Sequence, residues 1–233
     1  MVAMMRLSAE DVLKRHEKAL TKKEDFRSLY DEAYEFALPQ RNLYDGHYDG
    51  GSTGQKKMDR VFDSTAIHST QRFANRMQSG IFPPQRKWCR LEPGPDIPND
   101  RKQEAQAALD VYSDKLFSAL KQSNFDVAIG EFLLDLSVGT AVMMVQPGDS
   151  VNPLNFIPVP QYLVAFEEGA NGQVDNVYRR MRLKGEAIQG QWPNAKIPAE
   201  LKKKIDQNPT DDIELIEATV FDQKRGDYCY HVI

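Results

Sequence analysis

The sequence predicts an α+β fold in which helices come first and a strand-rich region with hairpins follows. Up to about residue 139, apolar residues recur at steps of three and four, as they do on the buried face of a helix. From Thr140 onwards, short β-branched and aromatic runs alternate with turns rich in glycine and asparagine. We therefore expect a mainly helical region over residues 1–139 and a strand-rich region over residues 140–233.

Five helices are expected in the first region. Ser8 has the side chain of an N-cap for the first helix, and Pro39 ends the second because it disfavours helical geometry in the residue before it. The Pro83-Pro84 pair ends the third helix, and Asn124 is expected to cap the fifth. The residues expected to face the core are Phe62, Ala66, Thr70, Phe73, Met77 and Ile81 in the third helix, and Ala105, Ala108, Leu109, Tyr112, Leu116, Phe117 and Leu120 in the fourth.

Two hairpins are expected in the second region. Residues 162–167 and 174–183 flank a Gly-Ala-Asn-Gly turn, and residues 213–222 and 228–233 flank Lys-Arg-Gly-Asp. Short helices are expected between the hairpins, over residues 184–207. The sequence stops inside the last of these strand patterns, so we expect the natural polypeptide to continue.

Composition narrows the class of protein. Of the 233 residues, 41% are hydrophobic and 27% are charged, which allows a sizeable core and argues against general disorder. The longest apolar stretch, Leu136 to Val145, is about half of the roughly 20 residues that a membrane-spanning helix needs. The formal net charge of −4 argues against tight binding of nucleic acid through its phosphates.

The charge is distributed unevenly. Residues 56–102 carry ten Lys or Arg against five acids, whereas residues 103–178 carry two against ten. Such blocks meet inside one subunit or across a subunit boundary, or they are simply two solvated faces that differ. His68, Arg72 and Arg76 share one helix face at four-residue steps, so this cationic edge is a candidate site for a neighbouring subunit's carboxylates or for phosphate; a plain solvated face is an equal alternative.

The sequence gives little support for a catalytic site. Gly50 to Gly54 matches the G-x-S-x-G pattern around Ser52, but a polar loop precedes it where a serine hydrolase needs a buried strand. The same stretch lacks the spacing of a phosphate-binding loop, and Cys89 next to Trp88 is more typical of an apolar filler than of a nucleophile. We predict no catalytic, cofactor-binding or metal-binding residues. Two alternatives stay open: a hydrolase using Ser52 or Cys89, and a nucleic-acid-binding module using the basic segment 56–102.

Three segments form an ordered pattern that goes beyond composition: residues 29–42, 62–80 and 81–94. The first reads LYDEAYEFALPQRN, the second contains FDSTA and FANRMQSG, and the third begins IFPP and continues to a tryptophan. The positions that carry the pattern are Tyr30, Tyr34, Pro39 and Arg41, then Asp63, Ser64, Phe73 and Asn75, then Pro83, Pro84 and Trp88.

In order and wording, these segments resemble the portal, or head-to-tail connector, proteins of short-tailed bacteriophages. The resemblance implies a structural subunit of a ring, usually of twelve copies, at one capsid vertex of the virion, assembled in the cytoplasm of the bacterial host. It implies as partners the terminase, which carries the ATPase, the major capsid protein and a tail adaptor, with double-stranded DNA passing through non-specifically and no membrane or cofactor involved. Both regions of this chain would form the wing of such a subunit, and the stem, clip and crown would follow.

Overall fold

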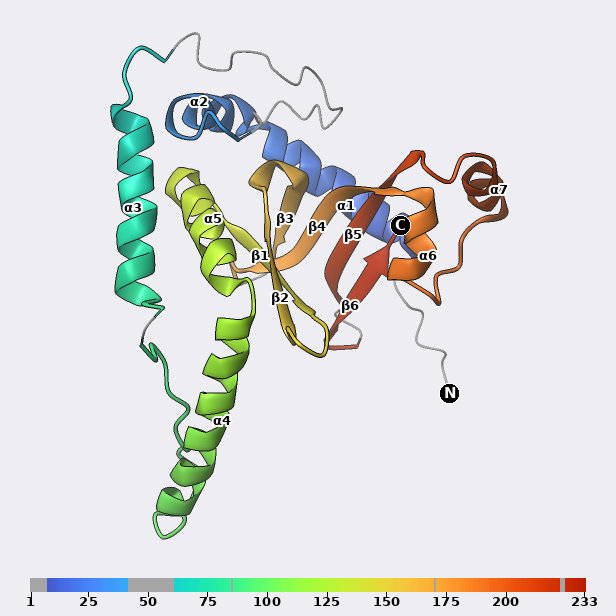
Figure 1. Cartoon of the computed structure of the whole chain (residues 1–233). Helices are drawn as coiled ribbons and strands as arrows, with labels where there is room; N and C mark the ends of the chain where they lie inside the picture. Colours follow the sequence, from blue (N-terminus) through green and yellow to red (C-terminus); the bar gives the residue numbers. More distant parts are fainter. Residues whose placement is uncertain (1–7, 42–60, 85, 170, 223–224) are drawn as a thin grey trace. The chain divides into compact units, whose positions relative to one another are not determined.

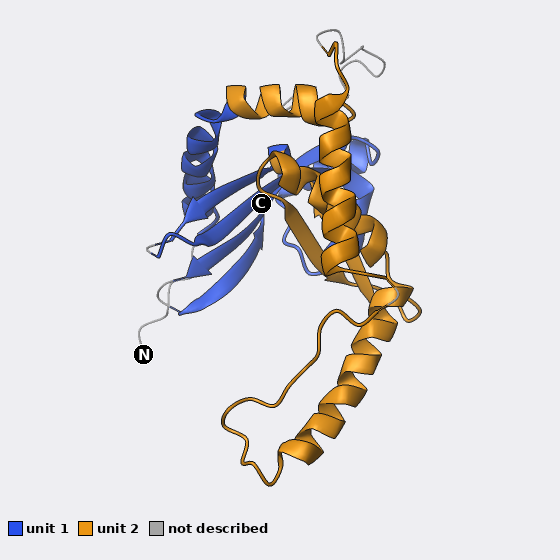
Figure 2. Ribbon diagram, turned by 90° about the vertical axis from the view of Figure 1, so that its left-hand side faces the viewer, with its two compact units in different colours: residues 1–27, 162–233 blue, residues 28–161 orange. Residues whose placement is uncertain are grey.

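The computed structural model describes residues 8–41, 61–84, 86–169, 171–222 and 225–233. The described residues form seven α-helices and six strands in two antiparallel sheets, with most helices before the strands (Figure 1). The expected α+β class is therefore confirmed. The chain divides into two compact units: unit 1 comprises residues 1–27 and 162–233, and unit 2 comprises residues 28–161 (Figure 2).

Unit 1 is built on a four-stranded antiparallel sheet in the order β3-β4-β5-β6. Both expected hairpins are present, β3 with β4 and β5 with β6. Gly172 and Gly226 lie in their turns with φ of 70° and 66°, a conformation that glycine adopts without steric cost. The elements of this unit are α1 (Ala9–Glu24), β3 (Val164–Glu168), β4 (Val174–Lys184), α6 (Gly185–Gln191), α7 (Ala199–Gln207), β5 (Asp212–Asp222) and β6 (Asp227–Val232), with a short 3-10 helix at Gln161–Leu163.

Helix α1 covers one face of this sheet. It begins as the sequence predicts, because the Ser8 hydroxyl accepts a hydrogen bond from the Asp11 backbone N–H, and the Asp11 carboxylate accepts one in return. Val12 and Ala19 then pack in one buried cluster with Tyr178 and other apolar residues of the sheet. Polar contacts fix the register of this packing.

The polar contacts converge on one carboxylate oxygen. Glu167 Oε2 accepts hydrogen bonds from Arg15 Nε on α1 at 3.0 Å, from Asn176 Nδ2 at 3.0 Å and from the Tyr178 hydroxyl at 2.9 Å. Burial and the neighbouring carboxylate raise the pKa of Tyr178, so its hydroxyl stays a donor at neutral pH.

Unit 2 combines helices with a two-stranded sheet. Helices α3 and α5 pack side by side through Ala74, Ile129 and Leu133, and β1 pairs antiparallel with β2. The elements are α2 (Arg27–Ala37), α3 (Thr65–Ile81), α4 (Lys102–Gln122), α5 (Phe125–Val138), β1 (Val142–Pro147) and β2 (Leu154–Val159). Helix α5 therefore ends and β1 begins near residue 139, where the sequence changes from a helical to a strand-like pattern. The compact units divide the chain at other points, after residues 27 and 161.

An aromatic cluster holds unit 2 together. The Trp88 ring stacks on Phe125 at 5.9 Å between centroids and meets Phe82 and Phe117 edge-on at 5.0 and 5.4 Å. Phe125 in turn meets Phe156 edge-on at 5.1 Å. Aromatic pairs with this geometry contribute about 0.5–1.5 kcal/mol each beyond the area they bury. The cluster thus joins the end of α3, the connector of residues 82–101, α4, α5 and β2.

Two of the predicted buried faces are wrong in part. Phe62 lies before α3 begins and is exposed, as are Phe73 and Ile81 on the helix, and the buried residues of α3 are Thr70 and Ala74. On α4, Ala108, Tyr112 and Leu116 of the predicted stripe are exposed, Ala105, Leu109 and Leu120 are partly buried, and only Phe117 is fully buried. The physical reason is that α4 extends away from α3 and α5 (Figure 1), so these helices do not cover the outer part of its stripe.

The predicted side-chain cap of α5 is also wrong. Asn124 occupies the N-cap position, but its side chain makes no cap hydrogen bond. Instead its amide donates to the Phe156 carbonyl at 2.6 Å and accepts from the Phe156 N–H at 2.8 Å. This reciprocal pair ties the start of α5 to β2, because two bonds to a strand backbone outweigh one bond to the helix.

None of the helices in the described ranges is both long enough and apolar enough to cross a membrane.

We predict that Trp88→Ala lowers the free energy of unfolding by about 3 kcal/mol, because it removes the ring shared by three aromatic contacts. Urea denaturation followed by far-UV circular dichroism measures this change. Phe62→Ala is the matched control, since Phe62 is 94% exposed and its truncation should change stability by less than about 0.5 kcal/mol. Equal effects of the two substitutions would contradict a central role for the cluster.

Candidate subunit-interface site

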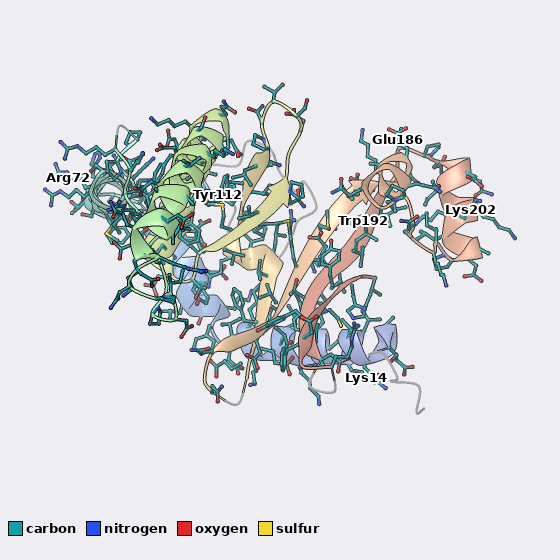
Figure 3. The ribbon with its side chains drawn as sticks, turned by 90° about the horizontal axis from the view of Figure 1, so that it is seen from below. Lys14, Arg72, Tyr112, Glu186, Trp192 and Lys202 are labelled. Atoms are coloured by element: carbon teal, nitrogen blue, oxygen red, sulfur yellow. The ribbon has the colours of Figure 1, made fainter. Side chains whose placement is uncertain are left out.

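His68, Arg72 and Arg76 lie on the exposed face of α3, one helical turn apart. Thr70 and Ala74 occupy the face that packs inward and are 7% and 3% exposed, so the cations point away from the core. Figure 3 shows Arg72 on the outer side of α3. With the residues that the structure describes, none of the three side chains forms an ion pair or a hydrogen bond. The edge is therefore open to anionic groups from outside the unit.

The connector is clamped to α4 by charge. Arg90 donates two hydrogen bonds to the Asp110 carboxylate, from Nε and Nη2, at 2.9 Å each. Lys87 pairs with Asp114 one turn further along α4. The Arg90 hydrogen bonds hold the pKa of the Asp110 carboxyl below its usual range. The basic and acidic blocks of the sequence therefore meet in part inside one unit, which is one of the arrangements left open above.

This clamp fixes which side of α4 faces outward. The Ser113 hydroxyl, on the clamped side, accepts a hydrogen bond from the Leu91 N–H at 3.3 Å. On another side of the helix, Tyr112 and Leu116 are 60% and 37% exposed. The Lys115 ammonium lies 5.7 Å from the centroid of the Tyr112 ring. We call this group, Tyr112, Lys115 and Leu116, the α4 knob.

The first motif positions hold α2 against α5. Tyr34 is buried, as are Leu38 and Pro39 at the end of the helix, and the Tyr30 ring lies against Gly139, where an added Cβ would come within 2.7 Å of it. A larger residue at position 139 would therefore displace the ring. The motif thus describes how α2 ends and where it packs.

Arg41 completes this junction as a bridge to α5. Its Nη2 donates to Glu131 Oε2 at 2.6 Å and to the Glu131 carbonyl at 3.1 Å, and its Nε lies 3.2 Å from Asp135 Oδ1. The Asp135 side chain is only 2% exposed. Burial raises the pKa of Asp135 to about 6, although Arg41 opposes the shift. The approach of Arg41 to Asp135 lacks hydrogen-bond geometry, which explains why it compensates only in part.

Asp63, Ser64, Pro83 and Pro84 lie at the two ends of α3, whereas Phe73 and Asn75 lie in its middle. Asp63 accepts hydrogen bonds from the Thr65 N–H and hydroxyl, both at 2.6 Å, whereas the Ser64 side chain makes no cap bond. These bonds lower the pKa of Asp63. At the far end, Pro83 and Pro84 lead the chain from α3 to Trp88 in the aromatic cluster.

Described residues of unit 2 line two depressions. The larger, about 600 Å³, is lined by Lys87, Trp88, Cys89, Arg90, Asp110 and Ser113. The smaller, about 410 Å³, is a groove between α3 and α5, with Gln71, Ala74 and Asn75 on one wall and Asp126, Gly130 and Glu131 among the residues on the other. Sequence reasoning missed this groove, because helical periodicity does not say which helices become neighbours.

Neither depression resembles a reaction centre. The lining of the larger one contains no histidine that could act as a base for Cys89, and its Asp110 is held by Arg90. Cys89 itself is exposed, so the predicted role as an apolar filler is wrong. Ser52 lies outside the described residues. Within the described ranges, no three His, Cys, Asp or Glu side chains are grouped so that they could hold a metal ion.

We predict a pH dependence of stability from Asp135. Its pKa is raised on folding, so the folded state binds a proton more tightly than the unfolded state between about pH 4 and pH 6. The free energy of unfolding should therefore fall as pH rises through this window, by about 3 kcal/mol for a shift from 3.8 to about 6.

Asp135→Asn removes this contribution, so the variant should gain stability relative to the wild type as pH rises from 4 to 7. Urea denaturation at several pH values measures the difference. Glu131→Gln, which changes the half-exposed partner of Arg41, is the control and should show a much smaller pH-dependent difference. Parallel pH profiles for wild type and Asp135→Asn would rule the buried carboxyl out as the source.

Comparison of the sequence with known proteins identifies the family of this chain. Residues 9–229 match the model of a family described as bacteriophage head to tail connecting protein. A comparison with curated proteins finds no match. The family match spans both units and includes every motif position discussed above. The chain therefore belongs to the bacteriophage head-to-tail connecting proteins, a family of structural proteins.

Proposed function

We propose that this chain is a subunit of a closed ring at one capsid vertex, where it joins head to tail and forms the conduit for DNA packaging and ejection. The observation that carries the proposal is that unit 2 leaves two chemically different surfaces unsatisfied: the cationic edge of α3 and the α4 knob. A head-to-tail contact between copies would cover two different surfaces in each subunit, and such a contact closes into a ring when its rotation closes.

Partners follow from this place in the virion. The ring would contain twelve copies and would contact the terminase, the major capsid protein and a tail adaptor. The chain would supply the wing of the subunit, with residues 1–139 as its mainly helical part and residues 140–233 as its strand-rich part, and the stem, clip and crown would follow. Assembly would take place in the cytoplasm of the bacterial host. The net charge of −4 supports a conduit past which DNA slides without specific binding.

The proposed role is mechanical, and we infer no reaction centre among the residues that the structure describes. The polar groups described above have structural roles. Glu167 links α1 to the sheet, and Arg41, just after α2, links the end of α2 to α5. The alternative of a nucleic-acid-binding module over residues 56–102 is not favoured, because Lys87 and Arg90 are already paired with aspartates of α4.

We predict that the double variant Arg72→Glu, Arg76→Glu impairs ring assembly while its helix content stays unchanged. Both side chains are exposed, so reversal of their charge should alter contacts between copies and leave the core intact. Mass photometry and circular dichroism measure the two properties. The control is Lys202→Glu, Lys203→Glu, which reverses two exposed cations on α7 of unit 1. Wild-type assembly by the α3 variant would contradict a role for the cationic edge.

A further inference from the structure

The α4 knob has the apolar composition typical of a surface that packs against another protein surface. Ala105, Ala108, Tyr112 and Leu116 follow one another at helical steps, a pattern that normally faces a core. The clamp between Arg90 and α4 prevents the helix from turning this stripe inward. Tyr112 and Leu116 therefore remain exposed in the isolated unit.

The groove between α3 and α5 has the complementary form. Ala74 and Gly130 line it with small side chains, so the two helices leave room between them. Val127, also in the lining, is 73% exposed. Asp126 and Glu131 make the lining acidic, and although Glu131 is paired with Arg41, Asp126 has no ion-pair partner within the described ranges. None of the residues that line this groove comes from α4.

The charges of the knob and of the groove side also match in sign and spacing. On α4, Lys115 and Glu104 lie on the same edge of the stripe, eleven residues or about 16 Å apart. On α3, Gln78 marks the level of Asp126, because its side chain donates a hydrogen bond to the Asp126 carbonyl. His68 of the cationic edge lies ten residues before Gln78, which is about 15 Å along the helix. If Lys115 of one copy meets Asp126 of another, Glu104 reaches the level of the cationic edge.

We propose that the α4 knob of one copy docks in the α3–α5 groove of the next copy. The proposal rests on the ring proposed above and names the surfaces that meet in it. Tyr112 and Leu116 fill the groove over Ala74 and Gly130, and Lys115 pairs with Asp126. The knob lies on α4 and the groove lies between α3 and α5, so the contact would join two different surfaces of each copy, as a head-to-tail contact requires.

A charge swap tests the contact directly. Lys115→Glu and Asp126→Lys are made singly and together in the purified protein, and the assembled fraction is measured by mass photometry across a concentration series. Each single variant should need a roughly tenfold higher concentration for half-assembly, because like charges then face each other. The double variant should return close to wild type. Lys121→Glu, an exposed cation near the C-terminal end of α4, is the matched control and should assemble normally.

The possible failures are separable. If the wild type forms rings and both single variants assemble equally well, or if the double variant is not rescued, the knob-in-groove contact is wrong while the ring stands. If the wild type stays monomeric at all concentrations, the proposed function itself is wrong. Unchanged urea midpoints for all variants confirm that a loss of assembly comes from the interface.

Discussion

The stacking of Trp88 on Phe125 is the contact on which the architecture of unit 2 depends. Through Phe82, Phe117 and Phe156, these two rings connect the end of α3, the connector, α4, α5 and β2 in one cluster. Because aromatic edges and faces have preferred orientations, the cluster fixes directions as well as distances. It sets where α4 leaves the helix pair and thereby where the α4 knob stands.

Polar contacts then decide which surfaces stay open. Arg90 pairs with Asp110 and Lys87 pairs with Asp114 on α4, and Arg41 pairs with Glu131 and Asp135 on α5. Among the described residues of unit 2, the open surfaces include an apolar stripe that carries Lys115, a groove that carries the unpaired Asp126, and the cationic edge of α3. Isolated surface pairs contribute little to stability, so such groups act through specificity between copies more than through the fold.

Local patterns in the sequence were sufficient for much of the fold. The Ser8 cap, the helix end before Pro39 and the two turns with Gly172 and Gly226 are all set by residues within a few positions of one another. The contacts that could not be predicted join residues far apart in the chain. Arg41 meets Asp135, and Asn124 leaves its expected cap for the backbone of Phe156.

In the candidate site too, local sequence patterns could be predicted and long-range contacts could not. Helical spacing placed His68, Arg72 and Arg76 on one face, and it placed Tyr112 and Leu116 on one stripe. Periodicity reports that a stripe is suited to burial, but it does not report whether the covering surface belongs to the same chain. The prediction of a buried face on α4 was therefore wrong for one unit.

Hydrogen exchange measured at increasing protein concentration tests most directly whether these surfaces are covered by other copies. Helices α3 and α4 should gain protection as copies associate, because their local opening then requires the contact to break, while α1 in unit 1 should change little. Protection of α3 and α4 that does not depend on concentration would contradict the account.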